Sequence, residues 1–543
     1  MIESKFNVGT AIINGIAMAE PPAIQFTNSR YASELLDSSI NEVKRSGGLK
    51  KIMIHADVDF DGVASSYIIY KVIADIVGRN NIAMCINRKR VHGITDDFVD
   101  LINKINGADR RIELAIVVDS STNDIDKITA TKSNVLVIDH HELEVPATQM
   151  TGATSNGRYV IVNNEIDHIP DMSGAEVVYE WLKASGYDEQ LKFYNLYSWV
   201  GVSLFSDVID GDNLRNQWYI ERVVKMNMLE DTLSKMYKSV CYGGRGLLDK
   251  TAIQFSLVPI INASVRTGHS TEMLEIIKNK PEDLSSLSKY KTEQTNIVEK
   301  LCGDAEVSRR ALVYTDMVTF NMDDVENGDS YAGLVATKLG DRYRKTCIAW
   351  YNTDKGIKGS FRLKGRYTKF DFRLKLNEIQ GMSASGHNEA FGFEWTESND
   401  VADVVQACVT IANNEGIDDT KVTIGIGDNA SAAYIDDDIR YIIADNEDDM
   451  KKIIKTQELQ AMAVINSRMS GNKKALIRVP FCKEAVKGPV VNESGRQMKY
   501  NVLGLEVLSF NDLFSKYDEG SGYLWLYPEL GKYLTVYAEG VRM

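Results

Sequence analysis

Three short polar strings, each at the end of an apolar run, constrain the fold of this chain more than any other feature. They are residues 55–62 (HADVDFDG), residues 117–119 (VVD) and residues 138–141 (IDHH). β-Branched apolar runs of this kind are typical of buried strands, and helical stretches separate them. Strands that alternate with helices predict a parallel sheet covered on both faces. Because functional groups of such sheets lie beyond the carboxyl ends of the strands, we expect the strings to meet at one edge.

The pattern predicts an α/β fold: a parallel-sheet domain, a helical connector, a smaller α/β domain and a β-containing C-terminal module. We place these parts at residues 1–213, 214–305, 306–427 and 428–543. In the first we expect strands at 51–55, 82–86, 114–118, 135–138 and 159–162, with helices at 63–77 and 96–105. The connector is expected to be helical, with an irregular stretch at 258–262. In the second domain we expect strands at 311–314, 346–351 and 356–363, helices at 333–339 and 401–413, and a loop at 383–387.

Composition limits the class of protein. A chain of 543 residues exceeds one ordinary core. The net charge of −14 argues against a general polyanion binder, but an acidic enzyme can still bind phosphates through metals and a local basic channel. The chain contains no run of about 18 apolar residues, so no membrane span is predicted. The six scattered cysteines and the lack of a secretory signal predict a cytoplasmic protein with reduced thiols.

The first string carries ligands for a divalent cation. Asp57, Asp59 and Asp61 share one face of an extended segment, and Gly62 permits a tight turn into a helix. Asp119 is available to bridge two ions. So many like charges in one place are tolerable only with cations, and imidazole plus carboxylate suits Mn²⁺ or Mg²⁺. A calcium loop is disfavoured because no glutamate occupies the twelfth position.

Apart from His55 and His387, the histidines divide into two groups. His140 and His141 diverge because they are adjacent, so one can bind metal while the other faces substrate. Asp139 is expected to orient an imidazole, and Asp57 stays ambiguous between a catalytic and a supporting role. His92, His168 and His269 are expected to be surface or core histidines.

Two charged stretches leave alternatives open. A basic stretch with interleaved aromatics between residues 361 and 375 predicts either a groove for single-stranded nucleic acid or the solvated face of a strand. Its members are Phe361, Arg362, Lys364, Arg366, Tyr367, Lys369, Phe370, Phe372, Arg373 and Lys375. The acidic run at residues 436–449 predicts a solvated surface, with a protein-partner site as the alternative.

These residues resemble the DHH phosphoesterase superfamily. Residues 139–141 and the preceding motif are similar to its metal-binding motifs, and residues 383–392 (SASGHNEAFG) resemble the glycine-histidine motif of the associated DHHA1 domain. Further similarities point to the RecJ branch. They are Asn87-Arg88 with Gly93, residues 259–266, residues 333–339 (GLVATKL), residues 359–362 (GSFR), and residues 204–209 around Asp207.

The resemblance implies roles for individual residues. One metal would be bound by His55, Asp59 and Asp119, and the other by Asp61, Asp119, His140 and Asp207. His141 would contact the scissile phosphate. From the residues themselves we predict that Asp57 and Asp139 act with His141 as the catalytic set. Substrate would be held by Asn87, Arg88, Arg266, Ser360, Arg362, Gly386 and His387.

The sequence also departs from the family. Phe391 replaces an alanine and would narrow the substrate cleft, while Ser385 replaces one glycine of a pair. The proline-glycine string that opens the family's oligonucleotide-binding barrel is absent, so residues 428–543 are not covered by the resemblance. Divergence of this extent favours a virus-encoded member.

The predicted function is a two-metal 5′→3′ exonuclease, most simply with Mn²⁺, that degrades single-stranded DNA in repair or recombination. Two alternatives remain. Phe391 and the missing barrel string would suit an enzyme that cuts short oligoribonucleotides or cyclic dinucleotides. An inactive replication or repair scaffold is the other, and the intact ligand set argues against it.

Overall fold

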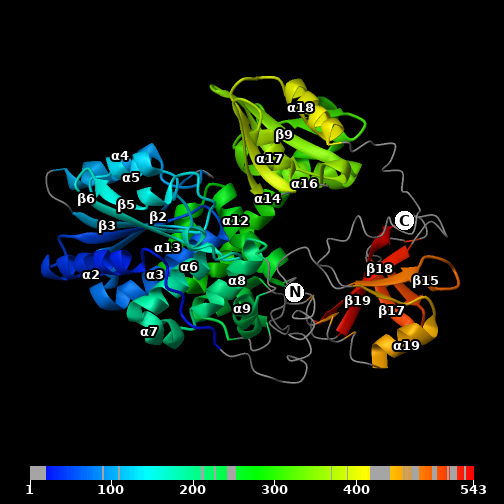
Figure 1. Ribbon diagram of the computed structural model, residues 1–543, viewed down its shortest axis with the longest axis horizontal. Helices are drawn as coiled ribbons and strands as arrows, with labels where there is room; N and C mark the ends of the chain where they lie inside the picture. The colour runs from blue at the N-terminus through cyan, green and yellow to red at the C-terminus, as the bar shows by residue number, and fades with distance from the viewer. Residues whose placement is uncertain are drawn as a thin grey trace. The chain divides into compact units, whose positions relative to one another are not determined.

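The computed structural model describes two compact units, formed by Met1–Asn262, Ser270–Ser288 and Ser431–Met543, and by Ala263–His269 and Lys289–Ala430. Within them it describes residues 20–88, 91–107, 111–209, 213–224, 228–240, 252–368, 370–387, 389–415, 441–455, 459, 462–463, 466, 476–491, 498–509, 513, 523–530 and 534–542 (Figure 1). None of the described helices is long and apolar enough to cross a membrane.

The first unit contains a six-stranded sheet in the order β2-β1-β3-β4-β6-β5. Its strands are β1 (Lys51–Ala56), β2 (Ile82–Ile86), β3 (Ile112–Val118), β4 (Asn134–Asp139), β5 (Thr151–Thr154) and β6 (Gly157–Asn163). All neighbours pair in parallel except β5, which pairs antiparallel with β6. The predicted parallel sheet is therefore confirmed, with one added antiparallel edge strand. β1 lies between β2 and β3, so the strand order reverses there, and sheets of this kind bind ligands beyond the strand ends at such a point.

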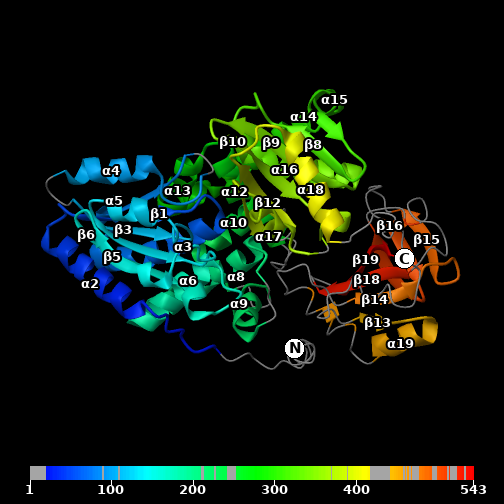
Figure 2. The same ribbon diagram turned by 45° about the horizontal axis from the view of Figure 1, so that its top comes forward.

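Helices cover both faces of this sheet. On one face α4 (Asp96–Asn106) and α5 (Ile125–Ala130) pack against alternate strand residues such as Val117 and Val137. On the other face lie α2 (Ser29–Arg45), α3 (Phe60–Val77) and α6 (Gly174–Leu182), as both views show (Figure 2). Because both faces are covered, β3 and β4 are buried along their whole length, which explains the apolar runs at residues 114–118 and 135–138.

Further helices of this unit extend beyond the sheet. They are α7 (Asp188–Phe193), α8 (Tyr197–Ser206), α9 (Leu214–Val224), α10 (Asp231–Val240) and α13 (Ser270–Asn279). The stretch at 258–262 was expected to be irregular, but it lies in helix α12 (Val258–Arg266). The irregularity is a π-helical turn at Ile253–Leu257, directly before it. Pro259 has no N–H to donate to that turn, which fits the change of helical pitch there.

The second unit contains a mixed sheet in the order β11-β12-β10-β9-β8-β7. Its strands are β7 (Ala311–Val313), β8 (Met317–Asn321), β9 (Thr346–Thr353), β10 (Gly356–Arg362), β11 (Met382–His387) and β12 (Ala390–Trp395). One face packs on α14 (Ser288–Leu301) and α16 (Gly328–Tyr343), the other on α17 (Phe372–Asn377) and α18 (Val401–Asn414). The expectation of a loop at 383–387 was wrong: these residues form β11, which pairs with β12 in a hairpin.

The C-terminal residues form a seven-stranded sheet in the order β13-β14-β18-β19-β17-β16-β15. Its elements are β13 (Tyr441–Ile443), α19 (Glu447–Lys455), β14 (Leu476–Pro480), β15 (Val486–Val491), β16 (Met498–Val502), β17 (Leu505–Ser509), β18 (Tyr523–Leu530) and β19 (Leu534–Arg542). It has a hydrophobic core of its own, and the predicted β-containing module is confirmed. Part of the acidic run, residues 436–440, lies outside the described residues. Glu447, Asp448 and Asp449 form the first turn of α19, where carboxylates stabilise a helix.

Candidate active site

The turn between β1 and α3 places three aspartates at the carboxyl edge of the sheet. Asp59 caps α3: its side chain accepts a hydrogen bond from the Gly62 amide at 3.2 Å. A Cβ at Gly62 would lie 2.6 Å from Asp57 Cα, so only glycine fits this turn. Asp61 sits one residue into the helix and is fully buried. The glycine that ends the string is therefore required by close packing of the turn.

The N-terminus of α6 holds the Asp61 carboxylate. The Gly174 amide donates to Oδ2 at 2.6 Å and the Ala175 amide donates to Oδ1 at 2.9 Å. Even so, burial raises the pKa of Asp61. The charge of His140 opposes this shift, and the charge of Asp59 raises the pKa further. Two amide donors do not offset the loss of water around this group.

Asp119 lies at the centre of the negative charge. It follows β3 in a left-handed backbone conformation (φ 62°), and its amide donates to the Ile138 carbonyl at 2.8 Å. Burial raises the pKa of Asp119 well above its ordinary value, and the charges of neighbouring aspartates raise it further. Those aspartates are Asp61, Asp59, Asp207 and Asp57. A cation at this place would remove the repulsion that the described residues leave uncompensated.

His140 completes a set of four ligand atoms. Its Nδ1 donates to the Met172 carbonyl at 2.8 Å, which leaves the Nε2 lone pair directed at the carboxylates. The distances from Nε2 are 3.2 Å to Asp119 Oδ1, 3.6 Å to Asp207 Oδ2 and 3.9 Å to Asp61 Oδ2. The ligand atoms of Asp61, Asp119, His140 and Asp207 all lie within 4.8 Å of one another.

Two unsatisfied atoms indicate that this site is built for a divalent cation. Asp119 Oδ1 is buried and accepts no hydrogen bond from any described residue. His55 Nδ1 is likewise buried without a partner among them. The other ring nitrogen of His55, Nε2, lies 3.2 Å from Asn87 Oδ1. Burial lowers the pKa of His55, so its ring is neutral with a free lone pair. Three carboxylates and an imidazole around such atoms suit a divalent cation.

Asp207 reaches this cluster from outside the sheet. It directly follows α8, and burial together with the charges of Asp61 and Asp59 raises its pKa well above the ordinary value. The structure thus brings together four of the six expected ligands. His55 belongs to none of the groups of described residues whose ligand atoms lie within 4.8 Å, while Asp59 lies in a second group with Asp57 and His92.

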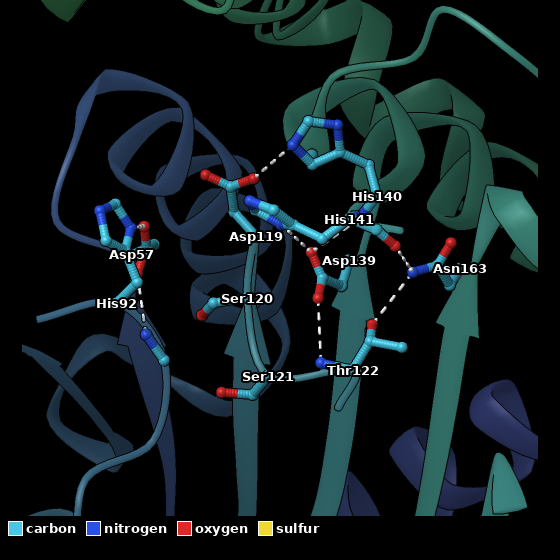
Figure 3. A network of polar contacts seen from close by, with 12 residues as sticks. Asp57, His92, Asp119, Ser120, Ser121, Thr122, Asp139, His140, His141 and Asn163 are labelled. Carbon is cyan, nitrogen blue, oxygen red and sulfur yellow. Dashed lines mark hydrogen bonds and ion pairs between the residues drawn. The ribbon is translucent and has the colours of Figure 1, made fainter. Parts of the chain in front are cut away.

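Asp139 organises a polar network beside the cluster (Figure 3). Its Oδ1 accepts from His141 Nδ1 at 2.7 Å, and its Oδ2 accepts from the Thr122 amide at 3.0 Å. Asn163, at the end of β6, donates to Thr122 Oγ1 and to the His141 carbonyl, both at 3.0 Å. Burial would raise the pKa of Asp139, but the charge and the hydrogen bond of His141 outweigh burial. The pKa of Asp139 is therefore lowered. In turn Asp139 raises the pKa of His141 to about 9.

His92 is the residue that sequence reasoning missed. It was expected to be a surface or core histidine, yet its Nδ1 lies 2.6 Å from Asp57 Oδ2. The Gly93 amide donates to Asp57 Oδ1 at 3.1 Å. Asn87 holds the same loop, because its Nδ2 donates to the carbonyls of Val91 and Gly93. The only signal in the sequence was the position of His92 beside Gly93, in the loop that follows β2.

In the second unit, Arg362 ends β10 with its guanidinium against α16. It donates to Thr337 Oγ1 and to Ser360 Oγ, each at 3.0 Å. A Cβ at Gly333 would lie 2.7 Å from Arg362 Nη2, so this glycine makes room for the guanidinium.

Arg266, near the end of α12, donates to Gln294 Oε1 at 3.2 Å. Gly386 has φ 130° in β11, and its carbonyl accepts from Arg373 at 2.8 Å. His387 ends β11. In the first unit, Arg88 is exposed beside Asn87.

The described residues of the basic stretch argue against the groove, which was one of the two alternatives. Arg366 is only 7% exposed and pairs with Asp316 at 2.6 Å, while Lys364 pairs with Asp341 at 2.8 Å. The aromatic rings between them belong to the hydrophobic core and are not available for base stacking. These rings are Phe361, Tyr367 and Phe372. Lys369 lies outside the described residues.

Phe391 does not narrow a cleft. It is buried in the core of the second unit, where its ring stacks on Phe361 with centroids 4.9 Å apart. Strand β12 pairs with β10 so that these two rings lie directly opposite each other. The substitution of alanine by phenylalanine therefore fills the core, and the argument for a shorter substrate loses this support.

Known proteins resemble this chain in sequence and fold. Residues 51–198 match the model of the DHH family, N-terminal domain. Over 424 residues the chain is 23% identical to YorK of Bacillus subtilis (strain 168), named as an SPbeta prophage-derived single-strand DNA-specific exonuclease, and 69% of each chain is covered. The fold resembles RecJ of Thermus thermophilus in complex with Mn²⁺, with a TM-score of 0.66 and 16% identity.

The structural likeness covers 99% of this chain and 76% of that RecJ chain. The same protein in complex with Mg²⁺ matches with a TM-score of 0.62, 16% identity, and coverage of 99% and 74%. The likeness in fold therefore extends into the C-terminal module, where the proline-glycine string of the family is absent.

Proposed function

Because this chain is a divergent, RecJ-like member of the DHH family and a metal-dependent phosphoesterase, we propose that it is a two-metal exonuclease for single-stranded DNA. It removes mononucleotides from the 5′ end and works with Mn²⁺ or Mg²⁺ in DNA repair or recombination in the cytoplasm. The observation that carries the proposal is the cluster of Asp61, Asp119, His140 and Asp207 around the buried, unbonded Asp119 Oδ1.

The chain offers ligands for two cations that share Asp119. We assign Asp61, Asp119, His140 and Asp207 to one, and His55, Asp59 and Asp119 to the other. When bound, the cations supply positive charge that activates water for attack on phosphorus. His140 presents Nε2 because Met172 fixes its other nitrogen. The free lone pair of His55 Nδ1 supports its assignment, although it lies outside the compact cluster.

His141 contacts the scissile phosphate in this proposal. Asp139 holds its Nδ1 and raises its pKa to about 9, so the ring is protonated at neutral pH and Nε2 donates to a phosphoryl oxygen. Water adds to phosphorus, the bond to the sugar oxygen breaks, and the products are a nucleoside monophosphate and a shortened strand. Asp139 is a positioning residue because it acts through His141.

Candidate substrate contacts are assigned in each unit by itself. Arg362 is held by Thr337 and Ser360 with a planar guanidinium that suits phosphate, and Gly386, His387 and Arg266 are assigned to the same task. Asn87 supports the loop of the first unit, and exposed Arg88 offers a charge for the DNA backbone. With Phe391 in the core, the alternative of short or cyclic substrates keeps only the missing barrel string as its support. A protein partner for the C-terminal module stays a prediction.

The test is cleavage by wild type and D119N with Mn²⁺, Mg²⁺ or EDTA. The substrates are single-stranded DNA labelled at either end, RNA, duplex DNA and a cyclic dinucleotide. We expect metal-dependent release of labelled mononucleotide from the 5′ end only. D119N removes a charge without changing shape and should lower kcat/KM at least about 1,000-fold. The matched control is D126N, because Asp126 is an exposed aspartate of α5. This variant should keep full activity.

Three results would contradict the proposal. Release from the 3′ end would reverse the polarity. Cleavage of only the cyclic dinucleotide would replace the substrate class. Wild-type protein that cleaves nothing with either metal would leave the scaffold as the better description.

A further inference from the structure

Two carboxylate–imidazole pairs flank the metal-binding cluster, and they match closely. In one, His141 Nδ1 lies 2.7 Å from Asp139 Oδ1; in the other, His92 Nδ1 lies 2.6 Å from Asp57 Oδ2. The imidazoles are 53% and 52% exposed, and both aspartate side chains are 1% exposed. Figure 3 shows the pairs on opposite sides of Asp119. Each thus has a buried anchor and a ring that solvent or substrate can reach.

Like the His141 pair, the His92 pair is anchored by the backbone. The Gly93 amide donates to Asp57 Oδ1 at 3.1 Å, and the Ile94 amide donates to Ser121 Oγ at 2.7 Å. Gly93 has φ 74°, and a Cβ there would lie 2.7 Å from Asp124 Oδ2. Only glycine fits this position, so the backbone next to His92 is closely packed against the loop that follows β3.

We propose that His92 is a second imidazole that contacts the substrate phosphate, on the side of the centre opposite His141. The inference rests on the proposed function. A substrate phosphate that approaches Asp57, Asp59 and Asp119 meets repulsion, so hydrogen-bond donors are needed around it as well as cations. Because Asp57 fixes Nδ1, the ring presents Nε2 as the donor to a non-bridging oxygen. Asp57 is then a positioning residue, the counterpart of Asp139.

The competing role for His92 is that of a metal ligand or of a purely structural partner of Asp57. Its ligand atom lies within 4.8 Å of those of Asp57 and Asp59, so the metal role has to be tested directly. Two side-chain amides separate the roles. H92N places an amide near the position of Nδ1 and keeps the contact with Asp57. H92Q places its amide near the position of Nε2 and keeps the outer donor.

The experiment compares wild type, H92N, H92Q and H92A, with H168N as the control. His168 is exposed and has φ 54°, a conformation that asparagine tolerates. Three quantities are measured: KM and kcat on single-stranded oligothymidylate with Mn²⁺, the Kd for the same strand in Ca²⁺ by fluorescence anisotropy, and the Kd for Mn²⁺ by calorimetry. Circular dichroism checks that each variant is folded.

We expect H92N and H92A to raise KM and the strand Kd roughly 10- to 100-fold, the loss of one hydrogen bond to a charged group. H92Q should recover most of this loss, and the Mn²⁺ affinity should stay within about threefold of wild type in all variants. H92N that binds and cleaves like wild type would overturn the proposal in favour of a structural role. Weaker Mn²⁺ binding in H92N would overturn it in favour of a metal ligand.

Failure of the two proposals is distinguishable. If wild type cleaves DNA and H92N keeps its KM, only the role of His92 falls. If wild type cleaves nothing but binds the strand, the strand Kd of H92N still decides the role of His92. If wild type neither binds nor cleaves, both proposals fall.

Discussion

A hydrogen-bonded imidazole partner, more than burial, distinguishes the aspartates of this site. Asp57 and Asp139 are buried, but each accepts from an imidazole and from backbone amides, and the pKa of each is lowered. Asp119 is buried without such donors, and its pKa is raised well above the ordinary value. Donors stabilise the charged form, whereas burial among like charges penalises it. The first two aspartates are therefore suited to hold imidazoles, and Asp119 is suited to hold a cation.

Asp119 should destabilise the metal-free protein at neutral pH. Its folded pKa is raised, so the folded state binds more protons than the unfolded state, and stability is lost as pH rises above the unfolded value. In EDTA at pH 7, D119N should have a higher Tm than wild type, by at least about 2–4 °C, the shift that ~1 kcal/mol produces. In Mn²⁺ the order should reverse. D126N should leave the Tm unchanged both in EDTA and in Mn²⁺. A lower Tm for D119N than for wild type in EDTA would contradict the argument.

Glu176 gives a second, pH-dependent prediction. Burial raises its pKa to about 7 from 4.5, although Arg215 opposes the shift. The folded state therefore holds the extra proton between these values, and the unfolding free energy of wild type falls relative to E176Q as pH rises from 4.5 to about 7. The loss should be on the order of 3 kcal/mol and level off above that range. Urea unfolding at a series of pH values measures it, and exposed Glu189 supplies the control, E189Q. A flat difference would exclude this role.

At the scale of elements, the end of one helix organises the cluster. α6 begins at Gly174, capped by Ser173, and its first amides hold Asp61. The same glycine leaves room for Asp119, because a Cβ at Gly174 would overlap Asp119 Oδ1. A helix N-terminus favours negative charge, so it gathers two aspartates that follow different strands. Helix packing thus sets the distance between the candidate ligands.

G174A tests this placement. Overlap with the Asp119 carboxylate should lower the unfolding free energy by about 1–3 kcal/mol, although alanine is the better helix former. The affinity for Mn²⁺ should fall at least about tenfold, since Asp119 must move. G392A, in an exposed position of β12 where a Cβ meets nothing within 3.8 Å, is the control and should leave the Mn²⁺ affinity unchanged. Unchanged Mn²⁺ binding in G174A would show that Asp119 is not a ligand.

At the scale of the whole molecule, the chain divides its tasks among separate hydrophobic cores. The candidate metal ligands all come from the first unit, between residues 55 and 207. Arg362 belongs to the second unit, whose sheet packs on two cores of its own, and the C-terminal sheet has a further core. Metal binding should therefore act on one part of the chain alone.

Hydrogen exchange with and without Mn²⁺ measures this division. At 100 times its Kd, a cation that binds only the folded state adds about 2.7 kcal/mol of stability. Amides should be protected in the turn after β1, after β3 and β4, at the start of α6 and at the end of α8. Peptides of the second unit and of the C-terminal sheet should exchange as before. Protection spread over all three sheets, or none at all, would contradict the assignment of the ligands.

The sequence alone determined the elements and the local motifs of this protein. The strands that precede the three polar strings, the parallel sheet and the placement of carboxylates at strand ends follow from periodicity, which is a local property. The contacts of Asp59 with Gly62 and of Asp139 with His141 are also local, because their partners lie within three residues.

Only the tertiary structure decided which side chains meet and which are buried. It brought His92 to Asp57 across 35 residues, an encounter that no local pattern encodes. It also placed Phe391 and Tyr367 in a core and paired Arg366 with Asp316, so residues that suit a nucleic-acid groove serve packing instead. The reason is that burial and pairing depend on contacts between distant segments. A period-two pattern shows which residues share a face of a strand, but not what covers that face.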